Sequence, residues 1–96
     1  MISKRREKGG VRVIFSLPGH EPAGSVTLVG DFNGWDRAAN PLRARPNGRR
    51  STSVVLPAGA VAEFRYVGED GAWFDDEQAE GWRDNPHGGR NGLVTT

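Results

Sequence analysis

The chain of 96 residues has no cysteine, only two histidines and no long apolar run. Without cysteine it can form no disulfide framework and no thiolate zinc site, and it offers no thiol nucleophile. No stretch of about 18 apolar residues exists that could cross a membrane as a helix. The basic N-terminus leads into an alternating segment instead of the apolar stretch of a signal peptide. We therefore expect a single small soluble domain in the cytoplasm, with no membrane partner.

Long helices are also missing from the sequence pattern. Fourteen glycines and six prolines interrupt the chain, and no stretch of 12 residues keeps an uninterrupted apolar period of 3.6. Between them lie short segments in which β-branched and aromatic residues alternate with polar ones, which is typical of strands. The expected strands are residues 11–17, 25–30, 41–45, 50–56, 62–68, 72–74 and 92–96. About seven short antiparallel strands predict an all-β, immunoglobulin-like sandwich.

The same pattern predicts the core and the connections. Alternation places Val13 and Phe15 on one face of the first strand and Phe64 and Tyr66 on the core face of the fifth. An Asn-Gly pair at residues 47–48 predicts a hairpin turn. Residues 75–90 show no usable period, so we expect a loop with room for one helical turn. The last strand, 92–96, is expected at a sheet edge.

Charge is distributed unevenly along the chain. Residues 1–12 carry five basic residues and one acidic residue, whereas residues 63–84 carry eight acidic residues. The acidic stretch would repel phosphate backbones, so we expect no nucleic-acid partner. Residues 1–10 are interpreted as a basic flexible N-terminal tail, and a nucleic-acid-binding arm is the alternative. If the tail is flexible, deletion of residues 1–9 leaves the fold nearly unchanged.

Groups able to perform catalysis are few. His20 and His87 lie in turn contexts, and neither a nucleophile elbow nor a histidine pair with zinc-ligand spacing is present. Two carboxylates could form a glycosidase acid and base pair, but their clustering in turns favours a solvated surface. The acidic residues also lack the spacing of an EF-hand calcium loop. We therefore expect no catalytic residue, no metal and no cofactor.

The three tryptophans are the strongest functional signal. Trp35, Trp73 and Trp82 each lie beside a turn, and loops lie at the surface. A flat indole ring at the surface can stack on the apolar C–H face of a sugar, while Arg65 and Asn91 can hydrogen-bond its hydroxyl groups. For Trp82, plugging one end of the sandwich is an equally good interpretation. The pattern predicts a sugar-binding surface.

Three segments carry a resemblance to a known family. VTLVGDFNGWD at 26–36, EFRYVGEDGAWFDD at 63–76 and GGRNGLV at 88–94 resemble carbohydrate-binding module family 48. That family includes the glycogen-binding domain of the AMP-activated protein kinase beta subunit and the N-terminal early-set domains of isoamylases and glycogen branching enzymes. The resemblance implies one early-set sandwich over residues 11–96 that binds glycogen, starch or maltooligosaccharides without catalysing a reaction. It also implies that the domain is accessory to a glycoside hydrolase family 13 type enzyme or another glycogen-metabolising enzyme.

The resemblance assigns roles to individual residues. Trp35 and Trp73 match the family's stacking tryptophans, Arg65 matches a lysine between them, and Asn91 matches an asparagine that binds glucose. His87 stands where the kinase domain has a leucine in its binding loop, so it is an additional candidate, as is Trp82. A protein-interaction module that has lost sugar affinity is the alternative function. Single-stranded nucleic-acid binding through the same tryptophans is disfavoured by the acidic stretch.

Overall fold

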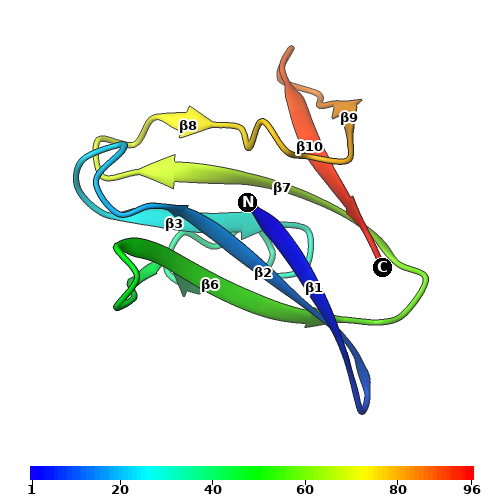
Figure 1. Cartoon of the computed structure of the whole chain (residues 1–96). Coiled ribbons are helices and arrows are strands. Elements are labelled where there is room, and N and C mark those ends of the chain that lie inside the picture. The colour runs from blue at the N-terminus through cyan, green and yellow to red at the C-terminus, as the bar shows by residue number, and fades with distance from the viewer.

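The structure, a computed structural model, describes all of residues 1–96 and consists of β-strands and loops (Figure 1). Two antiparallel sheets pack as a sandwich, which confirms the expected all-β, immunoglobulin-like fold. One sheet has the strand order β1-β2-β6-β5, and the other has the order β4-β3-β7-β10-β9, with β8 paired to β7. The strands are β1 (Ile2–Glu7), β2 (Gly10–Pro18), β3 (Val26–Gly30), β4 (Asn40–Pro41), β5 (Arg43–Ala44), β6 (Arg49–Leu56), β7 (Val61–Gly68), β8 (Trp73–Phe74), β9 (Gly81–Asp84) and β10 (Arg90–Thr95). With no helix present, none is a candidate to cross a membrane.

The core lies between the two sheets, on the strand faces that the alternation of apolar and polar residues predicts. Val13 and Phe15 of β2 are fully buried, as is Tyr66 of β7, and Phe64 is almost so. The rings of Phe15 and Phe64 meet across the interface with centroids 4.9 Å apart. Leu28 of β3 completes this centre. Because the inward residues of β7 fill the core, its alternate residues must face outward from the six-stranded sheet.

The N-terminal segment differs from the sequence-based expectation. Residues 2–7, expected within a flexible tail, form β1 and pair with β2 from Ile2↔Phe15 to Glu7↔Gly10. The side chain of Ile2 packs against the core. The turn between the strands uses Gly9 at a φ of 95°, a conformation that suits glycine. The basic residues are therefore the exposed positions of an edge strand, and the prediction of a flexible tail was wrong.

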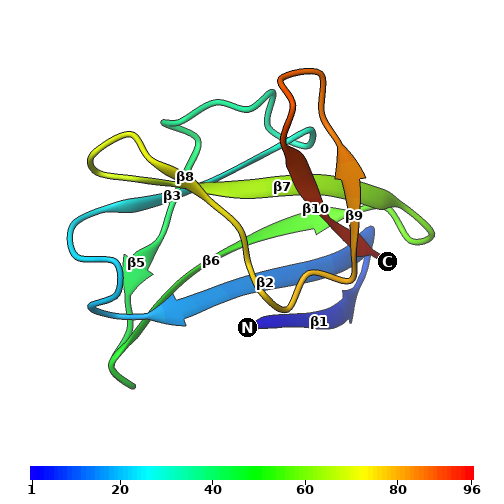
Figure 2. The ribbon, with the colours of Figure 1, turned by 90° about the horizontal axis from the view of Figure 1, so that it is seen from above.

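The C-terminal part also contains more strand than the sequence predicts. The stretch 75–90, expected as a loop, includes β9, and β10 lies between β7 and β9 instead of at an edge (Figure 2). Gly92 of β10 allows this close packing, since a Cβ there would lie 3.0 Å from the Cβ of Ala79 and 3.3 Å from the ring of Phe64. The loop between β9 and β10 is thereby carried onto the outer face of the sheet.

The expected third strand, residues 41–45, is divided between the sheets. β4 pairs with β3 and β5 pairs with β6, so the chain crosses from one sheet to the other at Leu42. The Leu42 side chain packs against the core, and its backbone N–H donates to the carbonyl of Val26. The expected hairpin turn follows, with Gly48 at a φ of 76°.

Candidate functional site

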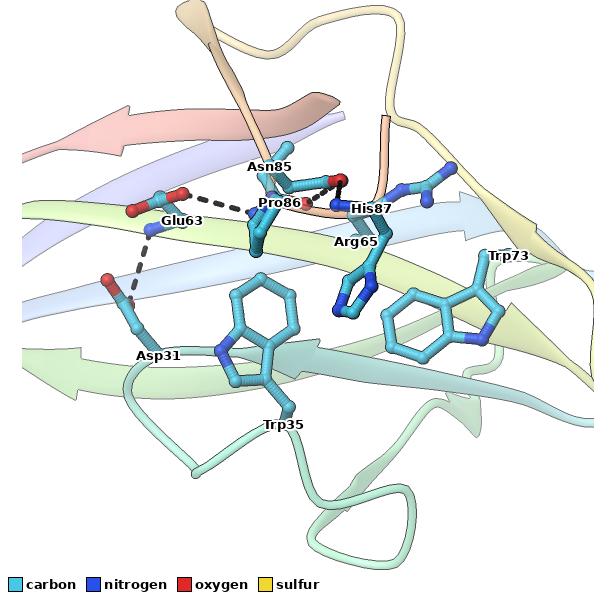
Figure 3. Close-up of a pocket in the computed structure, with 9 residues that line it drawn as sticks. Asp31, Trp35, Glu63, Arg65, Trp73, Asn85, Pro86 and His87 are labelled. Atoms are coloured by element: carbon cyan, nitrogen blue, oxygen red, sulfur yellow. Dashed lines mark hydrogen bonds between the residues drawn. The ribbon is translucent and has the colours of Figure 1, made fainter. Parts of the chain in front are cut away.

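A pocket of about 590 Å³ opens on the outer face of the six-stranded sheet (Figure 3). Its walls come from the loop after β3, the strands β7, β8 and β10, and the loop between β9 and β10. The structure thus brings together five of the six residues singled out in the sequence. The lining residues are Asp31, Trp35, Glu63, Arg65, Trp73, Asn85, Pro86, His87 and Asn91.

The loop after β3 presents Trp35 through an unusual backbone. Trp35 has a φ of 60°, the left-handed region that aromatic residues rarely adopt. The side-chain oxygen of Asn33 accepts hydrogen bonds from the N–H groups of Gly30, at 3.0 Å, and Trp35, at 3.1 Å. Its amide group donates to the carbonyl of Leu28 at 3.1 Å and to Asn40 at 2.8 Å. Asn33 therefore fixes the turn that places the indole.

Gly30 and Phe32 explain the rest of the GDFNGW segment. A Cβ on Gly30 would collide with the ring of Phe32 and with the carbonyl oxygen of Glu63. The Phe32 ring packs over Phe15 in the core, with ring centroids 6.3 Å apart. The segment therefore turns one aromatic side chain inward as an anchor and presents the other, Trp35, to the pocket.

Trp73 forms the second aromatic wall. It lies on β8 opposite Val67, on the outer side of the sheet, and is 36% exposed. Its ring centroid is 6.3 Å from that of Trp35, and the two planes are inclined by 33°. The guanidinium carbons of Arg37 and Arg65 lie 5.5 and 5.7 Å from the Trp73 centroid. The two indoles therefore form a bent aromatic surface bordered by cations.

Arg65 is held in the pocket from two sides. Its Nε donates to the carboxylate of Asp75 at 2.8 Å, and its guanidinium lies beside the Trp73 ring. The side chain is mostly buried, which limits the positions it can take. Guanidinium N–H groups that Asp75 does not use can donate to a ligand in a fixed plane.

Asn91 belongs to a polar network on the opposite side of the pocket. The residue is only 8% exposed, and its amide group donates to Glu63 at 3.1 Å. Its side-chain oxygen accepts from Asn85 at 3.2 Å. The other carboxylate oxygen of Glu63 accepts from Arg83 at 3.0 Å. These contacts fix the orientation of the Asn91 amide before any ligand arrives.

The network also holds the loop that carries His87. The side-chain oxygen of Asn85 accepts hydrogen bonds from the N–H groups of His87, at 3.0 Å, and Gly89, at 3.1 Å. Figure 3 shows the imidazole of His87 pointing toward the space between the two indoles. His87 is therefore placed where it can contact a ligand stacked on either tryptophan.

Trp82 is the one candidate that lies elsewhere. It pairs with Gly92, which in turn pairs with Phe64, so these residues share the inward face of the sheet. Asn91 and the pocket occupy the other face. Trp82 lies at the sheet edge and is 37% exposed, and the guanidinium carbon of Arg90 lies 3.8 Å from the centroid of its ring.

Four pocket residues were not singled out from the sequence. Glu63 had a signal, because it is two positions from Arg65 and must share its face of β7. Asp31 belongs to the GDFNGW segment, and its carboxylate accepts from the N–H of Glu63 at 3.2 Å. Asn85 and Pro86 had no sequence signal, since the pairing of β9 with β10 brings them to the pocket.

The site offers surfaces for binding and no assembled metal-ligand cluster. No group of three or more His, Asp or Glu side chains is placed to hold a metal ion. Glu63 is engaged by Arg83 and Asn91, and Asp75 is engaged by Arg65. Bent aromatic walls with fixed hydrogen-bonding groups suit a ligand that has apolar faces and hydroxylated edges.

Comparison with known proteins gives a partial similarity to two large enzymes. The chain is 38% identical over 50 residues to the 1,4-alpha-glucan branching enzyme GlgB of Rhodospirillum rubrum. It is 39% identical over 51 residues to the protein of the same name from Paramagnetospirillum magneticum. The aligned segments cover 49% and 51% of this chain but only 7% of each relative. No family model matches the chain.

Proposed function

From the partial similarity to branching enzymes and the geometry of the pocket, we propose that this chain is a non-catalytic module that binds α-1,4-glucan. Glucose units stack on Trp35 and Trp73, while Arg65, Asn91 and His87 contact their hydroxyl groups. The observation that carries the proposal is the pair of indoles inclined at 33° in one polar pocket. The names of the relatives, which give 1,4-alpha-glucan, support this class of ligand.

The inclination of the two rings favours an α-linked chain. Successive glucose units of an α-1,4-glucan turn relative to one another, so the chain curves, whereas a β-1,4-glucan forms a flat ribbon. Two planes that meet at 33° can each receive one unit of a curved chain. A flat ribbon would lie on one ring and lift from the other. We therefore expect maltooligosaccharides to bind better than cellooligosaccharides of similar length.

The similarity also supports an accessory role. Each match occupies 7% of a much longer enzyme, which is compatible with a non-catalytic domain. We propose that the module serves a glycogen-metabolising enzyme by keeping glucan close to its active site. A cytoplasmic location and the absence of a nucleic-acid partner stay predictions.

Isothermal titration calorimetry with maltoheptaose tests the proposal. We expect a Kd on the order of 10 µM to 1 mM, because most of the ligand stays solvated on a surface site. Trp35→Ala and Trp73→Ala should each weaken binding by about 2 kcal/mol, or roughly thirtyfold. Trp82→Ala is the matched control and should leave the affinity unchanged, since Trp82 lies on the other face.

Two outcomes would contradict the proposal. A folded protein that gives no heat with millimolar maltoheptaose has no glucan site, and the protein-interaction alternative then stands. Binding that survives both Trp35→Ala and Trp73→Ala would place the glucan outside the pocket.

A further inference from the structure

The outer face of the four-stranded sheet, opposite the pocket, carries an unusual set of side chains. Val11, Val13 and Phe15 of β2 face the core, so Arg12, Ile14 and Ser16 face outward. The strand pairings place residues of β1, β5 and β6 beside them. We call this surface the arginine–serine face, and its arginines are Arg5, Arg12, Arg43, Arg45 and Arg49.

Three of the arginines donate hydrogen bonds to serine side chains of a neighbouring strand. Arg12 donates from Nη1 to Ser53 Oγ at 2.9 Å. Arg45 donates from Nε to Ser51 Oγ at 2.9 Å. Arg49 donates from Nε to Ser16 Oγ at 2.7 Å and from Nη2 to the Ser16 carbonyl at 3.2 Å.

These bonds arrange the charges before a partner arrives. Each guanidinium has five N–H donors, so one or two bonds to serine leave donors free for an anion. Holding the side chains in place also lowers the conformational entropy lost on binding.

The positive charge of this face is only partly neutralised. Glu7 is its one acidic residue, and its carboxylate accepts from Arg12 at 2.5 Å and from Arg5 at 3.1 Å. Arg43, Arg45 and Arg49 form no ion pair. The end of the face formed by β5 and the start of β6 therefore presents three cations without a counter-charge.

We propose that the arginine–serine face is a docking surface for an acidic surface of a partner protein. Two apolar residues, Ile14 and Val55, also face outward here, and Val55 is 44% exposed. Arginine together with apolar contact is typical of protein interfaces. The face has no aromatic residue on which a nucleic-acid base could stack. A protein partner is therefore favoured over a nucleic acid.

The location of the face adds a functional consequence. It belongs to the sheet that lies across the core from the pocket, as Figure 1 shows for β2 and β6 against β7. A partner docked there would leave the pocket open. This inference does not depend on which ligand the pocket binds.

The test uses poly-L-glutamate as the acidic probe, at about 150 mM salt so that weak nonspecific attraction is screened. In NMR titrations of the intact chain, we expect shifts of backbone amides in β2, β5 and β6. The double variant Arg45→Gln/Arg49→Gln should weaken binding about tenfold or more. The charge-matched control Lys8→Gln/Arg90→Gln alters cations outside the unpaired end and should weaken it less than threefold. Circular dichroism and thermal melting establish that both variants are folded.

Each other result would overturn the proposal. No binding at this salt concentration would show that the face does not recognise acidic polypeptides. Equal losses in the two double variants would reduce the interaction to net charge. Tighter binding of single-stranded polyuridylate than of poly-L-glutamate, through the same arginines, would identify a nucleic-acid site instead.

Discussion

Trp35 shows how one residue's backbone determines the shape of the pocket. Its φ of 60° is unfavourable for an aromatic residue and typically costs about 1 to 3 kcal/mol, so the surrounding structure must enforce it. Asn33 does so through bonds to the N–H groups of Gly30 and Trp35. The indole is thereby positioned by a side chain that does not itself line the pocket.

We predict that Asn33→Ala weakens both the fold and the pocket. Its four hydrogen bonds are lost, and we expect the free energy of unfolding to fall by about 1 to 3 kcal/mol. Maltoheptaose affinity should fall about tenfold or more because Trp35 leaves its place. Urea denaturation and calorimetry measure the two effects.

Asn33→Asp is the matched control for this prediction. It keeps the acceptor for Gly30 and Trp35 but loses the donors to Leu28 and Asn40, so it should fall between the wild type and Asn33→Ala. Wild-type affinity in Asn33→Ala would show that Trp35 holds its position without Asn33.

Tyr66 forms a buried side-chain hydrogen bond at the core. Its hydroxyl donates to Asp76 at 2.8 Å, and burial together with this carboxylate raises the pKa of Tyr66 above its ordinary value. Tyr66 is therefore protonated as a donor throughout the usual pH range. Tyr66→Phe would remove the hydroxyl that donates to the nearly buried carboxylate of Asp76. We therefore expect a loss of about 1 to 3 kcal/mol in unfolding free energy.

Guanidinium denaturation tests the Tyr66 prediction, with Phe64→Ala as the reference for a core cavity, at about 3 to 5 kcal/mol. The double variant Tyr66→Phe/Asp76→Asn should recover part of the loss, because the buried charge is removed. An unchanged midpoint in Tyr66→Phe would mean that the hydrogen bond contributes nothing to stability.

How much of the site could be predicted depends on what places each residue. Trp35 and Trp73 lie in local motifs beside turns, so the sequence alone could identify them. Asn85 reaches the pocket only through the pairing of β9 with β10, which local periodicity does not reveal. Trp82 lies on the opposite face for the same reason, because a strand residue's face depends on its register.

At the scale of strands, the sequence pattern did not predict β1 because of the composition of this segment. Only Ile2 is apolar among its six residues, and the rest are polar or charged. Edge strands often carry such charges because they discourage pairing with other chains. The expectation of a flexible tail took these charges as a sign of disorder, whereas they are the solvent-facing positions of a paired strand.

We predict that deletion of residues 1–9 destabilises the fold but leaves the pocket intact. The deletion removes the pairing with β2 and the packing of Ile2, for which we expect about 2 kcal/mol. A domain of this size should then melt roughly 8 to 16 °C lower. Maltoheptaose affinity should stay within about threefold, because the pocket is on the other sheet. Thermal melting at the wild-type midpoint would contradict the role of β1.

The ion pair of Lys4 with Glu80 links β1 to the segment before β9. The carboxylate accepts from Lys4 Nζ at 2.7 and 2.8 Å and from the N–H of Thr95 at 2.8 Å. The hydrogen bonds from Lys4, then from Thr95, lower the pKa of Glu80 below 4.5. Its stabilisation is therefore present above about pH 4.5 and is lost as the pH falls through the lower folded-state pKa.

We predict that Glu80→Gln reduces the loss of unfolding free energy that occurs as the pH falls. At pH 7 the variant should lose about 0.2 to 1 kcal/mol, since the pair is partly exposed. Urea denaturation between pH 3 and 7 measures the effect. Glu77→Gln is the control, because Glu77 forms no ion pair. If both variants follow the same pH curve, the Lys4 contact contributes no pH-dependent stability.

At the scale of the whole molecule, alternation was sufficient to predict the sandwich but not the order of its strands. The alternation in residues 11–17 and 62–68 predicts which side chains face the core. The structure confirms this prediction for Phe15 and Phe64. The division of residues 41–45 between the sheets depends on Leu42 packing across the core, which is a long-range contact. Local patterns contain no information on such contacts.

We predict that bound maltoheptaose stabilises the whole domain against unfolding. A ligand that binds only the folded state raises the free energy of unfolding by about 2.7 kcal/mol at 100 times its Kd. Maltoheptaose at that concentration should therefore raise the melting temperature by roughly 10 to 20 °C. Trp35→Ala, with about thirtyfold weaker binding, should gain only about 1 kcal/mol at the same sugar concentration. Cellohexaose at equal mass concentration controls for the general stabilisation by sugars that are excluded from protein surfaces. Equal increases with both sugars, or in both proteins, would show that the stabilisation does not come from glucose units stacked in the pocket.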